Sequence, residues 1–316
     1  MKVEILQTTR NSVGAAGVAG VLLRDLIDYA GLFAPASLDM PTAVANYHAY
    51  SRSEWRWVLG HFVVPVARLG EFEEALAELP AARPGANVAR WRLSVLLGSD
   101  PVAEVASVRE FNVRMATVTS IGGAVVESVE IKAVSAEQIR WLSGIIPSEL
   151  TTYFETSSAN CWDWIAAVAD CGRRAKLRTG GEAADKFPSP AGVMEFIRRC
   201  STAKVPFKAT AGLHHPLRSV HRLTYQPDSP SGIMHGFLNV FLAAAFLRSG
   251  MTPELAGELL EEQRPEVFRF DLDGVRWRKH RLGANEIDAA RRRFAVSFGS
   301  CSFTEPIDDL RCLHLL

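Results

Sequence analysis

The sequence predicts a (β/α)₈ barrel of the TIM type, and three observations lead to this fold class. Short apolar and β-branched runs alternate with amphipathic helical segments along most of the chain. The connections between them are short, as in parallel sheets whose strands are joined by crossover helices. No early strand is followed by G-x-G-x-x-G, so a dinucleotide-binding doubly wound fold is unsupported. A chain of 316 residues is also within the range of one α/β barrel with additions.

Seven β–α units follow one another along the chain. The expected strands are Leu59–Val66, Trp91–Leu97, Glu127–Ala133, Leu150–Thr156, Arg174–Arg178, Val205–Ala211 and Phe294–Ser300. The expected helices are Leu69–Leu79, a helix opened by Asp100-Pro101, helices starting at Ser135, Ser158 and Ser189, and a short C-terminal helix. Ser and Asp are favoured N-cap residues, and proline is tolerated in the first helical turn. Each helix is therefore expected to return the chain to the start of the next strand.

Two parts of the chain depart from this alternation. Residues 1–58 are expected to form an N-terminal helical extension that packs on the barrel of residues 59–316, with one domain overall. Late in the chain, Phe268–Arg281 is expected to be an inserted β-hairpin around Asp273-Gly274. The barrel strand that is still lacking is expected near His235–Val240.

Composition excludes several classes of partner. The 35 basic and 35 acidic residues give zero formal charge, so there is no cationic surplus for nucleic acid or an anionic membrane. The basic stretch Arg276–Arg293 is expected to be a solvated face or an oligomer contact, which leaves a homo-oligomer open. Five cysteines without a C-x-x-C pair indicate free thiols in a reducing compartment. The apolar run Val13–Leu23 contains three glycines and leads into charged Arg24, so we expect a cytoplasmic protein outside the membrane.

Alternation within four middle strands places charged side chains inside the barrel. The apolar positions of each strand are expected to face the helices, so the positions between them point inward. The inward residues are Glu130, Lys132, Tyr153, Glu155, Lys176, Arg178, Lys208 and Thr210. We expect a polar, cationic active-site mouth at the C-terminal strand ends. The alternative is a structural ion network in which the two glutamates neutralise Lys132 and Lys176.

Lys208 has the clearest candidate chemistry. Burial and neighbouring cations such as Lys176 and Arg178 are expected to lower the pKa of Lys208. A neutral amine can attack a carbonyl carbon and form a Schiff base. In this hypothesis Glu155 or Glu130 is the general acid and base, and the neighbouring cations hold an anionic group. The alternative is that Lys208 binds a carboxylate or phosphate without covalent chemistry.

Two glycine-containing loops add candidate anion-binding groups. Gly180 and Gly181 follow one strand, and Gly299 and Ser300 stand at the end of another. Such loops expose backbone N–H groups that suit phosphate or carboxylate. With Lys132, they extend the expected anion site around the mouth.

The loop after Val205–Ala211 contributes paired histidines. His214 is a candidate for proton transfer, and His215 is a candidate anion contact. Together with His235 and a carboxylate, they form the alternative of a divalent metal site; otherwise no cofactor is expected. Cys301 is expected to be a packed thiol, and Glu305 is expected to cap the last helix.

Two strings resemble strands of class I aldolases of the deoxyribose-phosphate type. Lys208-Ala209-Thr210-Ala211-Gly212 resembles the K-T-S-T-G strand of that family, whose lysine forms the Schiff base. The string KLRTGG, starting at Lys176, resembles the family's K-A-S-G-G strand, although the two strings occur in the reverse chain order. Over nearly the full length, DYAGLF, KLRTGG, FKATAGLHHP and FGSCSF resemble an uncharacterised bacterial barrel family. The aldolase resemblance implies a Schiff-base lyase.

Three hypotheses of function follow. The first is a Schiff-base lyase that acts through Lys208 on a small phosphorylated or carboxylated carbonyl metabolite. The second is a metal-dependent enzyme that uses His214, His215 and His235 with a carboxylate. The third is a non-catalytic barrel that captures an anionic metabolite, and the fold class does not decide among them.

Overall fold

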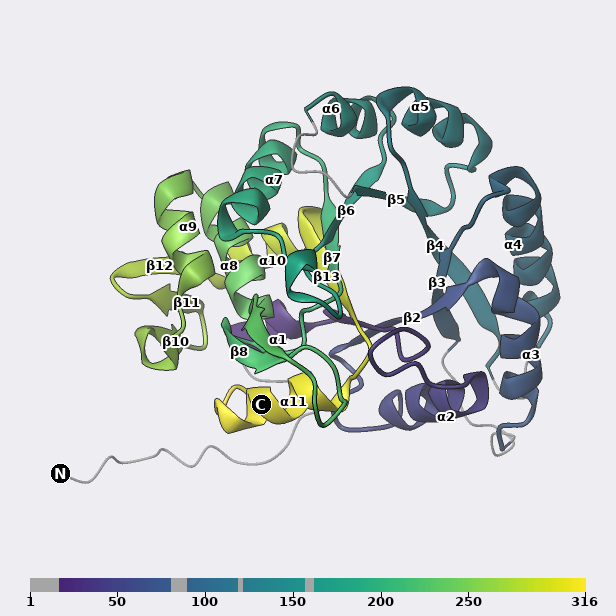
Figure 1. Cartoon of the computed structure of the whole chain (residues 1–316), viewed down its shortest axis with the longest axis horizontal. Helices are drawn as coiled ribbons and strands as arrows, with labels where there is room; N and C mark the ends of the chain where they lie inside the picture. Colours follow the sequence, from purple (N-terminus) through teal and green to yellow (C-terminus); the bar gives the residue numbers. More distant parts are fainter. Residues whose placement is uncertain (1–16, 81–89, 119–121, 157–161) are drawn as a thin grey trace.

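A closed parallel barrel forms the body of the protein in the computed structural model, which describes residues 17–80, 90–118, 122–156 and 162–316. Its eight strands follow the order β1-β13-β7-β6-β5-β4-β3-β2 around the ring. Figure 1 shows this ring with helices on its outside. The predicted (β/α)₈ fold class is therefore confirmed.

Seven of the eight barrel strands overlap the runs that the sequence predicted. The barrel strands are β1 (Ile27–Tyr29), β2 (Leu59–Pro65), β3 (Trp91–Leu96), β4 (Ala124–Lys132), β5 (Thr151–Thr156), β6 (Arg174–Arg178), β7 (Phe207–Thr210) and β13 (Ala295–Ser300). All pairings between them are parallel. The C-terminal ends of the strands therefore meet at one end of the barrel, where Arg178 and Thr210 lie.

Three of the predicted helices begin directly after their predicted capping residues. The helices are α1 (Val18–Leu23), α2 (Met40–Tyr50), α3 (Leu69–Ala77), α4 (Pro101–Ala116), α5 (Ala136–Ile145), α6 (Trp162–Asp170), α7 (Pro190–Thr202), α8 (Phe237–Arg248), α9 (Pro253–Glu261), α10 (Ala284–Arg293) and α11 (Thr304–Cys312). Asp100, Ser135 and Ser189 each accept a hydrogen bond from a backbone N–H of the first turn. Ser158, the expected start of the helix now seen from Trp162, lies outside the described residues.

The eighth barrel strand corrects the sequence analysis. β1 lies between β13 and β2, so a part of the expected N-terminal extension completes the barrel. The strand expected near His235–Val240 is wrong, because this segment enters the helix α8. Ten consecutive residues of α8, Phe237–Phe246, are buried. A helix that is apolar all round has no amphipathic period to distinguish it from a buried strand.

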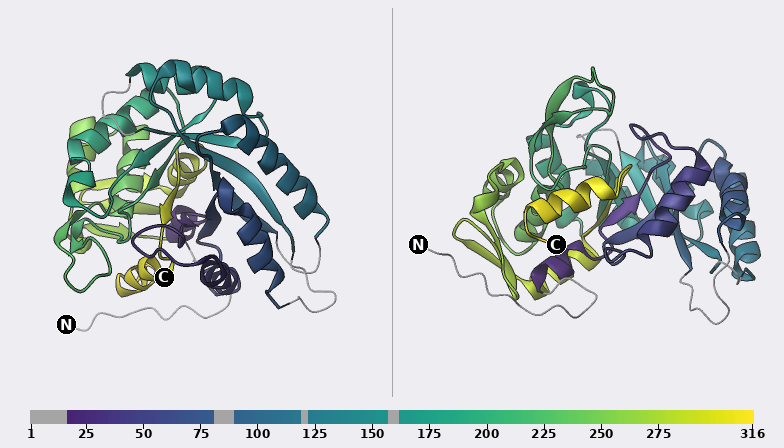
Figure 2. Two further views of the ribbon diagram at one scale, coloured as in Figure 1. Left: turned by 45° about the vertical axis from the view of Figure 1, so that its right-hand side comes forward. Right: turned by 90° about the horizontal axis from the view of Figure 1, so that it is seen from below.

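Two small antiparallel sheets are added to the barrel. The expected late hairpin around Asp273-Gly274 is present as β10 (Phe268–Phe270) and β11 (Gly274–Trp277), and β12 (His280–Gly283) extends it to three strands. The sequence did not predict the second sheet, formed by β8 (Ser219–Arg222) and β9 (Ser231–Met234). Figure 2 shows that this green hairpin projects from the body of the molecule.

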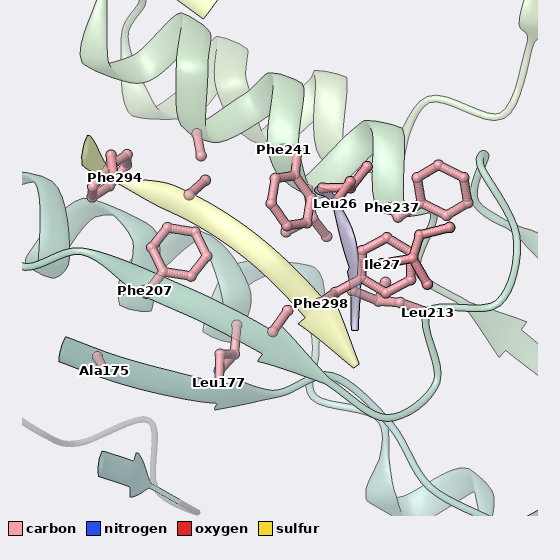
Figure 3. Packing of buried hydrophobic residues seen from close by; sticks show 14 of the residues in the cluster. Leu26, Ile27, Ala175, Leu177, Phe207, Leu213, Phe237, Phe241, Phe294 and Phe298 are labelled. Atoms are coloured by element: carbon pink, nitrogen blue, oxygen red, sulfur yellow. The ribbon is translucent and has the colours of Figure 1, made fainter. Parts of the chain in front are cut away.

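Aromatic packing outside the barrel orients β7. Phe207 packs on Phe294, with ring centroids 5.1 Å apart, and Phe237 of α8 stacks on Phe298 at 5.0 Å. Figure 3 shows these rings around β7, β13 and α8. Phe207 and Ala209 belong to this buried cluster, so Lys208 between them points into the barrel.

A buried arginine joins the two segments at the seam of the barrel. Arg291 is 6% exposed, and its Nε donates a hydrogen bond to Leu22 O at 2.7 Å. Its Nη2 donates to Arg24 O at 3.0 Å, and its Nη1 donates to the carbonyls of Ala295 and Val296. The guanidinium thereby connects the chain before β1 with β13.

Two further findings concern the described part of the chain. Cys171, Cys301 and Cys312 form no disulfide there, and Cys161 lies outside it. None of the helices in these ranges has the length and apolar character needed to cross a bilayer.

Candidate active site

Lys208 lies at the centre of the barrel between two carboxylates. Its side chain is 2% exposed, and its Nζ is 2.6 Å from Asp28 Oδ2 on β1 and 2.6 Å from Glu130 Oε1 on β4. Burial alone would lower the pKa of Lys208, but the charges of Asp28 and Glu130 outweigh burial and raise it. The expected lowering of this pKa is therefore wrong. The sequence did not predict Asp28 as a neighbour of Lys208. Lys176, the adjacent lysine on β6, is itself paired with Glu130 and Glu155.

Lys176 continues the network toward the C-terminal end of the barrel. Its Nζ is 2.6 Å from Glu130 Oε2 and 2.7 Å from Glu155 Oε2. Arg178 Nε is 3.2 Å from Glu155 Oε1, and the Arg178 side chain is 44% exposed. Burial would raise the pKa of Glu130, but the ammonium groups of Lys176 and Lys208 lower it to about 2. Glu130 is thus a carboxylate shared by two cations.

The charges at this site balance, which corrects the expected cationic mouth. Lys176, Arg178 and Lys208 are paired with Asp28, Glu130 and Glu155. Lys132 is exposed because it is the last residue of β4, and the structure does not bring it into the network. The ion network that the sequence left as an alternative is present around Lys176, without Lys132.

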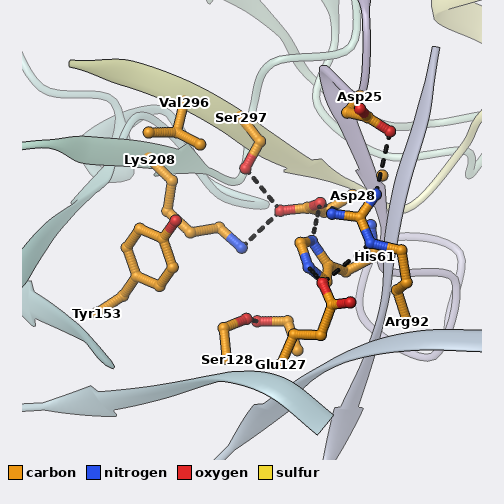
Figure 4. A network of polar contacts seen from close by, with 12 residues as sticks. Asp25, Asp28, His61, Arg92, Glu127, Ser128, Tyr153, Lys208, Val296 and Ser297 are labelled. Carbon is orange, nitrogen blue, oxygen red and sulfur yellow. Dashed lines mark hydrogen bonds and ion pairs between the residues drawn. The ribbon is translucent and has the colours of Figure 1, made fainter. Parts of the chain in front are cut away.

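Neutral and cationic groups complete the surroundings of the two central carboxylates. Ser297 Oγ donates to Asp28 Oδ2 at 2.8 Å, and Ser94 Oγ donates to Glu130 Oε1 at 2.6 Å. His61 Nδ1 lies 3.0 Å from Asp28 Oδ1. Figure 4 shows Asp28 between Lys208, Ser297 and His61. These contacts hold each carboxylate in one orientation, as catalytic groups require.

A cavity opens above the network at the C-terminal end of the strands. It has a volume of about 250 Å³, and its polar wall consists of Glu130, Lys176, Arg178, Lys208, Thr210, His214 and Cys301. A second cavity of about 520 Å³ adjoins it and shares Ala34, Arg178, Ala211 and His214 with it. We call them the inner and the outer cavity. Their shared wall indicates one site that extends from Lys208 to the outer surface of the barrel.

His214 lies in the wall between the two cavities. It is 8% exposed, and its Nδ1 is 3.2 Å from Glu305 Oε2, without hydrogen-bond geometry. Tyr225 OH donates to the same Glu305 oxygen at 3.1 Å. Glu305, expected as a helix cap, therefore holds side chains at the rim, while Ser302 Oγ accepts its backbone N–H. A carboxylate at one ring nitrogen of a histidine that faces a cavity is an arrangement suited to proton transfer.

The other two candidate histidines do not line either cavity, although His215 Nε2 lies 3.9 Å from Glu305 Oε1. His215 Nδ1 lies 2.6 Å from Asp309 Oδ2, and its ring stacks on His221. His235 Nε2 donates to Pro188 O at 2.8 Å. Across the described residues, no group of three or more His, Cys, Asp and Glu side chains has an arrangement that could hold a metal ion. The histidine placement therefore gives no support to the metal alternative.

Only some residues of the two glycine-containing loops line a cavity, and the others are packed against the protein. Gly299 lines the inner cavity, and Gly181 lines the outer one. Gly180 packs closely against Gly212, since a Cβ added to Gly180 would lie only 2.8 Å from Gly212 Cα and has no room there. Ser300 is buried, and its Oγ accepts the N–H of Ser302 at 3.3 Å. Neither Gly180 nor Ser300 is among the residues that line these two cavities.

Sequence reasoning missed the partners on the opposite strands. Asp28, His61, Ser94 and Ser297 each stand at or near an apolar run, in LIDY, GHFVV, RLSVL and AVSF. A lone polar residue between buried apolar neighbours is the signal that identifies them. Cys301 lines the inner cavity, and burial raises the pKa of its thiol, in keeping with the expected unreactive thiol.

Comparison with known proteins returned no match, either among protein-family models or among curated proteins. The aldolase resemblance therefore rests on the strings that begin at Lys176 and Lys208. These two residues are register partners on β6 and β7. The chemistry open to the site therefore follows from the side chains that form it.

Proposed function

We propose that the protein is an enzyme that acts on a small carbonyl compound with a carboxylate or phosphate, and that Lys208 forms a Schiff base with it. One observation carries this proposal: Lys208 is among the residues that line a cavity of substrate size, and its amine contacts a carboxylate on each side. A nucleophile beside its proton acceptor is the usual arrangement for covalent catalysis.

The raised pKa of Lys208 is compatible with this chemistry. Glu130 Oε1 takes one proton from the ammonium, and the neutral amine adds to the carbonyl carbon. After the addition, one proton passes from the nitrogen of the adduct to its alkoxide oxygen, which gives the carbinolamine. Glu130 then returns its own proton to the carbinolamine hydroxyl, which leaves as water. The resulting iminium carries the same single positive charge as the ammonium, so Asp28 and Glu130 stabilise the cation before and after the reaction.

Arg178 is the best group to hold the anionic end of the substrate. It lines both cavities, and only its Nε has a partner among the described residues, Glu155. Its two terminal nitrogens are therefore available as a fork for carboxylate or phosphate. Gly181 and Lys186 line the same outer cavity. His214, in the shared wall, is placed to move a proton on the substrate.

Borohydride trapping tests the proposal. The protein is incubated with a panel of keto acids and phosphorylated aldehydes, reduced with borohydride, and examined by intact and peptide mass. We expect one reduced adduct, on Lys208, that is absent from Lys208→Met and retained in a matched Lys204→Met variant at an exposed lysine. No adduct with any compound, or an adduct on another lysine, would exclude Lys208 as the nucleophile.

Non-covalent capture of an anionic metabolite is the second candidate function. The observation that favours it is that Lys208 rests as an ammonium between two carboxylates, which is an unreactive form. This candidate predicts that the same compounds raise the melting temperature of the protein without forming an adduct. Thermal shift and trapping on the same panel separate the two functions.

A further inference from the structure

A chain of ion pairs runs through the barrel from one end to the other. Five carboxylates and five cations alternate along it, and we call this set the ion chain. Its members in order are Asp25, Arg92, Glu127, His61, Asp28, Lys208, Glu130, Lys176, Glu155 and Arg178. Because the strands are parallel, Asp25 just before β1 marks the N-terminal end, and Arg178 at the end of β6 marks the C-terminal end.

The lower half of the ion chain leads from solvent to Lys208. Arg92 Nη1 is 3.1 Å from Asp25 Oδ1, and Arg92 Nε is 2.9 Å from Glu127 Oε2. His61 Nε2 is 3.1 Å from the same Glu127 oxygen, and His61 Nδ1 is 3.0 Å from Asp28 Oδ1. Figure 4 shows these links from Asp25 and Arg92 to Asp28. Asp28 therefore divides its two oxygens between His61 and Lys208.

His61 is the histidine of this half, and histidine is the side chain whose unperturbed pKa lies nearest to neutral pH. Burial would lower the pKa of His61, but the carboxylates of Asp28 and Glu127 raise it, against the opposing guanidinium of Arg92. Against the effect of burial, the charges of Lys208 and then His61 hold the pKa of Asp28 well below its usual range, and hydrogen bonds from His61 and Arg92 lower that of Glu127 to about 2. Arginine stays charged at every physiological pH. The imidazole is thus the one variable charge beside Asp28 on this side.

We propose that His61 is a positioning residue for Lys208, and that its charge, acting through the shared carboxylate of Asp28, sets how firmly Lys208 holds its proton. A charged His61 neutralises part of Asp28 and so weakens the attraction of Asp28 for the ammonium. When His61 loses its proton, Asp28 acts on Lys208 alone. The amine is then harder to deprotonate, although it lies on the other side of the carboxylate.

This coupling has a consequence for the reaction that rests on the proposed function. Schiff-base formation needs a neutral amine, so a protonated His61 favours it and a neutral His61 opposes it. The N-terminal end of the barrel, away from the cavities, would then tune the reactivity of a residue in the inner cavity. The coupling itself does not depend on any substrate, because both charges belong to side chains of the protein. It is also reciprocal, so a change at Lys208 must shift the titration of His61.

Titration of His61 by NMR tests the coupling directly. The imidazole signals are followed against pH in the full-length wild type and in Lys208→Met, with the His61 signal assigned from its loss in His61→Gln. In Lys208→Met the Asp28 carboxylate no longer has the ammonium as a counter-ion, so it attracts the His61 imidazolium more strongly. We therefore expect the His61 midpoint to rise by about one pH unit. The exposed Lys204→Met control leaves the midpoint unchanged. A midpoint in Lys208→Met equal to that of the control would overturn the proposal.

A second variant keeps the test decisive if Lys208→Met does not fold. Glu130→Gln is nearly isosteric and removes one of the two carboxylates at Lys208. The ammonium is then neutralised by Asp28 alone, which leaves less of the Asp28 charge to stabilise a protonated His61. We expect the His61 midpoint to fall, opposite in sign to the first variant. General loosening of the fold does not produce shifts of opposite sign. An unchanged midpoint in Glu130→Gln would also overturn the coupling.

The two proposals fail separately. If the titrations shift as expected and no compound is trapped on Lys208, the coupling stands and the Schiff-base function fails. If Lys208 is trapped and the His61 midpoint does not move, the function stands and the coupling fails. If both hold, the rate of trapping in His61→Gln at neutral pH should fall several-fold below that of the wild type.

Discussion

Lys176 and Lys208 are register partners on neighbouring parallel strands, so two lysines stand side by side inside the barrel. Both ammonium groups lie 2.6 Å from Glu130, one on each carboxylate oxygen. Without that carboxylate, two like charges in a region of low dielectric would repel each other strongly. Glu130 is therefore the group on which the pair depends.

Replacing Glu130 should destabilise the fold. Glu130→Met leaves two buried ammonium groups short of a counter-ion, and we expect a loss of about 3–5 kcal/mol in the free energy of unfolding at pH 7. Urea denaturation measures this loss. The matched variant Glu137→Met, at an exposed position of α5, should cost less than about 1 kcal/mol. Equal losses in the two variants would show that Glu130 is not a buried counter-ion.

The free energy of unfolding should be highest between about pH 5 and 6.5. The pKa values of Glu127 and Glu130 are lowered to about 2, so their stabilisation is complete above their unfolded values and is lost as pH falls toward 2. The pKa of His61 is raised, so its stabilisation is complete below its unfolded value of about 6.5 and is lost as pH rises through the folded value. Urea midpoints from pH 3 to 9 give the profile.

His61→Gln serves as the control for the alkaline side of this profile. The glutamine does not titrate, so the decline above pH 6.5 should be weaker than in the wild type. The acid side should remain, because the carboxylates there still lose their charge. An alkaline decline as steep as that of the wild type would contradict the assignment to His61.

Arg291→Met should loosen the seam of the barrel. It leaves the buried carbonyls of Leu22 and Ala295 and the partly buried carbonyl of Arg24 without this donor, which should cost about 3 kcal/mol or more. The neighbouring Arg292 is 72% exposed and pairs with Asp288, so Arg292→Met should cost less than about 1 kcal/mol. Thermal or urea unfolding of the two variants provides the comparison.

Gly180→Ala should destabilise the loop beside the outer cavity. The added Cβ would lie 2.8 Å from Gly212 Cα and 2.6 Å from the Phe187 ring, so the loop must shift at a cost of about 1–3 kcal/mol. Gly70 lies in α3 with no atom within 4 Å of its added Cβ. Gly70→Ala should therefore stabilise by about 0.5–1 kcal/mol. If both variants changed the free energy of unfolding in the same direction, the close packing at Gly180 would not be the cause of its effect.

Arg178 should be required for anion binding. We expect inorganic phosphate to raise the melting temperature of the wild type and to have little effect on Arg178→Met. Lys132→Met should keep the wild-type response, because Lys132 lies at the exposed end of β4 and outside both cavities. A response that is lost with Lys132 and kept with Arg178 would reverse the assignment.

The period of the strands was sufficient to identify the interior groups but not their partners. Alternation with apolar neighbours places Glu130, Glu155, Lys176 and Lys208 inside, and all four are buried. The same rule does not bury Lys132, which is the last residue of β4 and is exposed. A periodicity argument gives the face of a residue, and the depth of that residue depends on where the strand ends.

The direction of the Lys208 pKa shift depended on a contact with Asp28 that local patterns do not reveal. β1 has only three residues, and its Asp28 reaches Lys208 because β1 closes the ring against β13. The sequence predicted that the cations around Lys208 outnumber the inward glutamates. In the barrel a distant carboxylate reverses the balance. Contacts between segments so far apart in the chain follow from the closed topology and are not encoded in any short window.

The pairing of β1 with β13 also bears on how the protein folds. The first and last barrel strands are almost the whole chain apart, and such long-range contacts form late and slowly. The open sheet of β2 to β7 already contains Lys208, Lys176 and Glu130 before the ring closes. Asp28 stands on β1, and it reaches Lys208 on β7 because β1 and β7 both pair with β13 in the closed ring. Closure of the ring therefore also supplies Lys208 with the second of its two counter-ions.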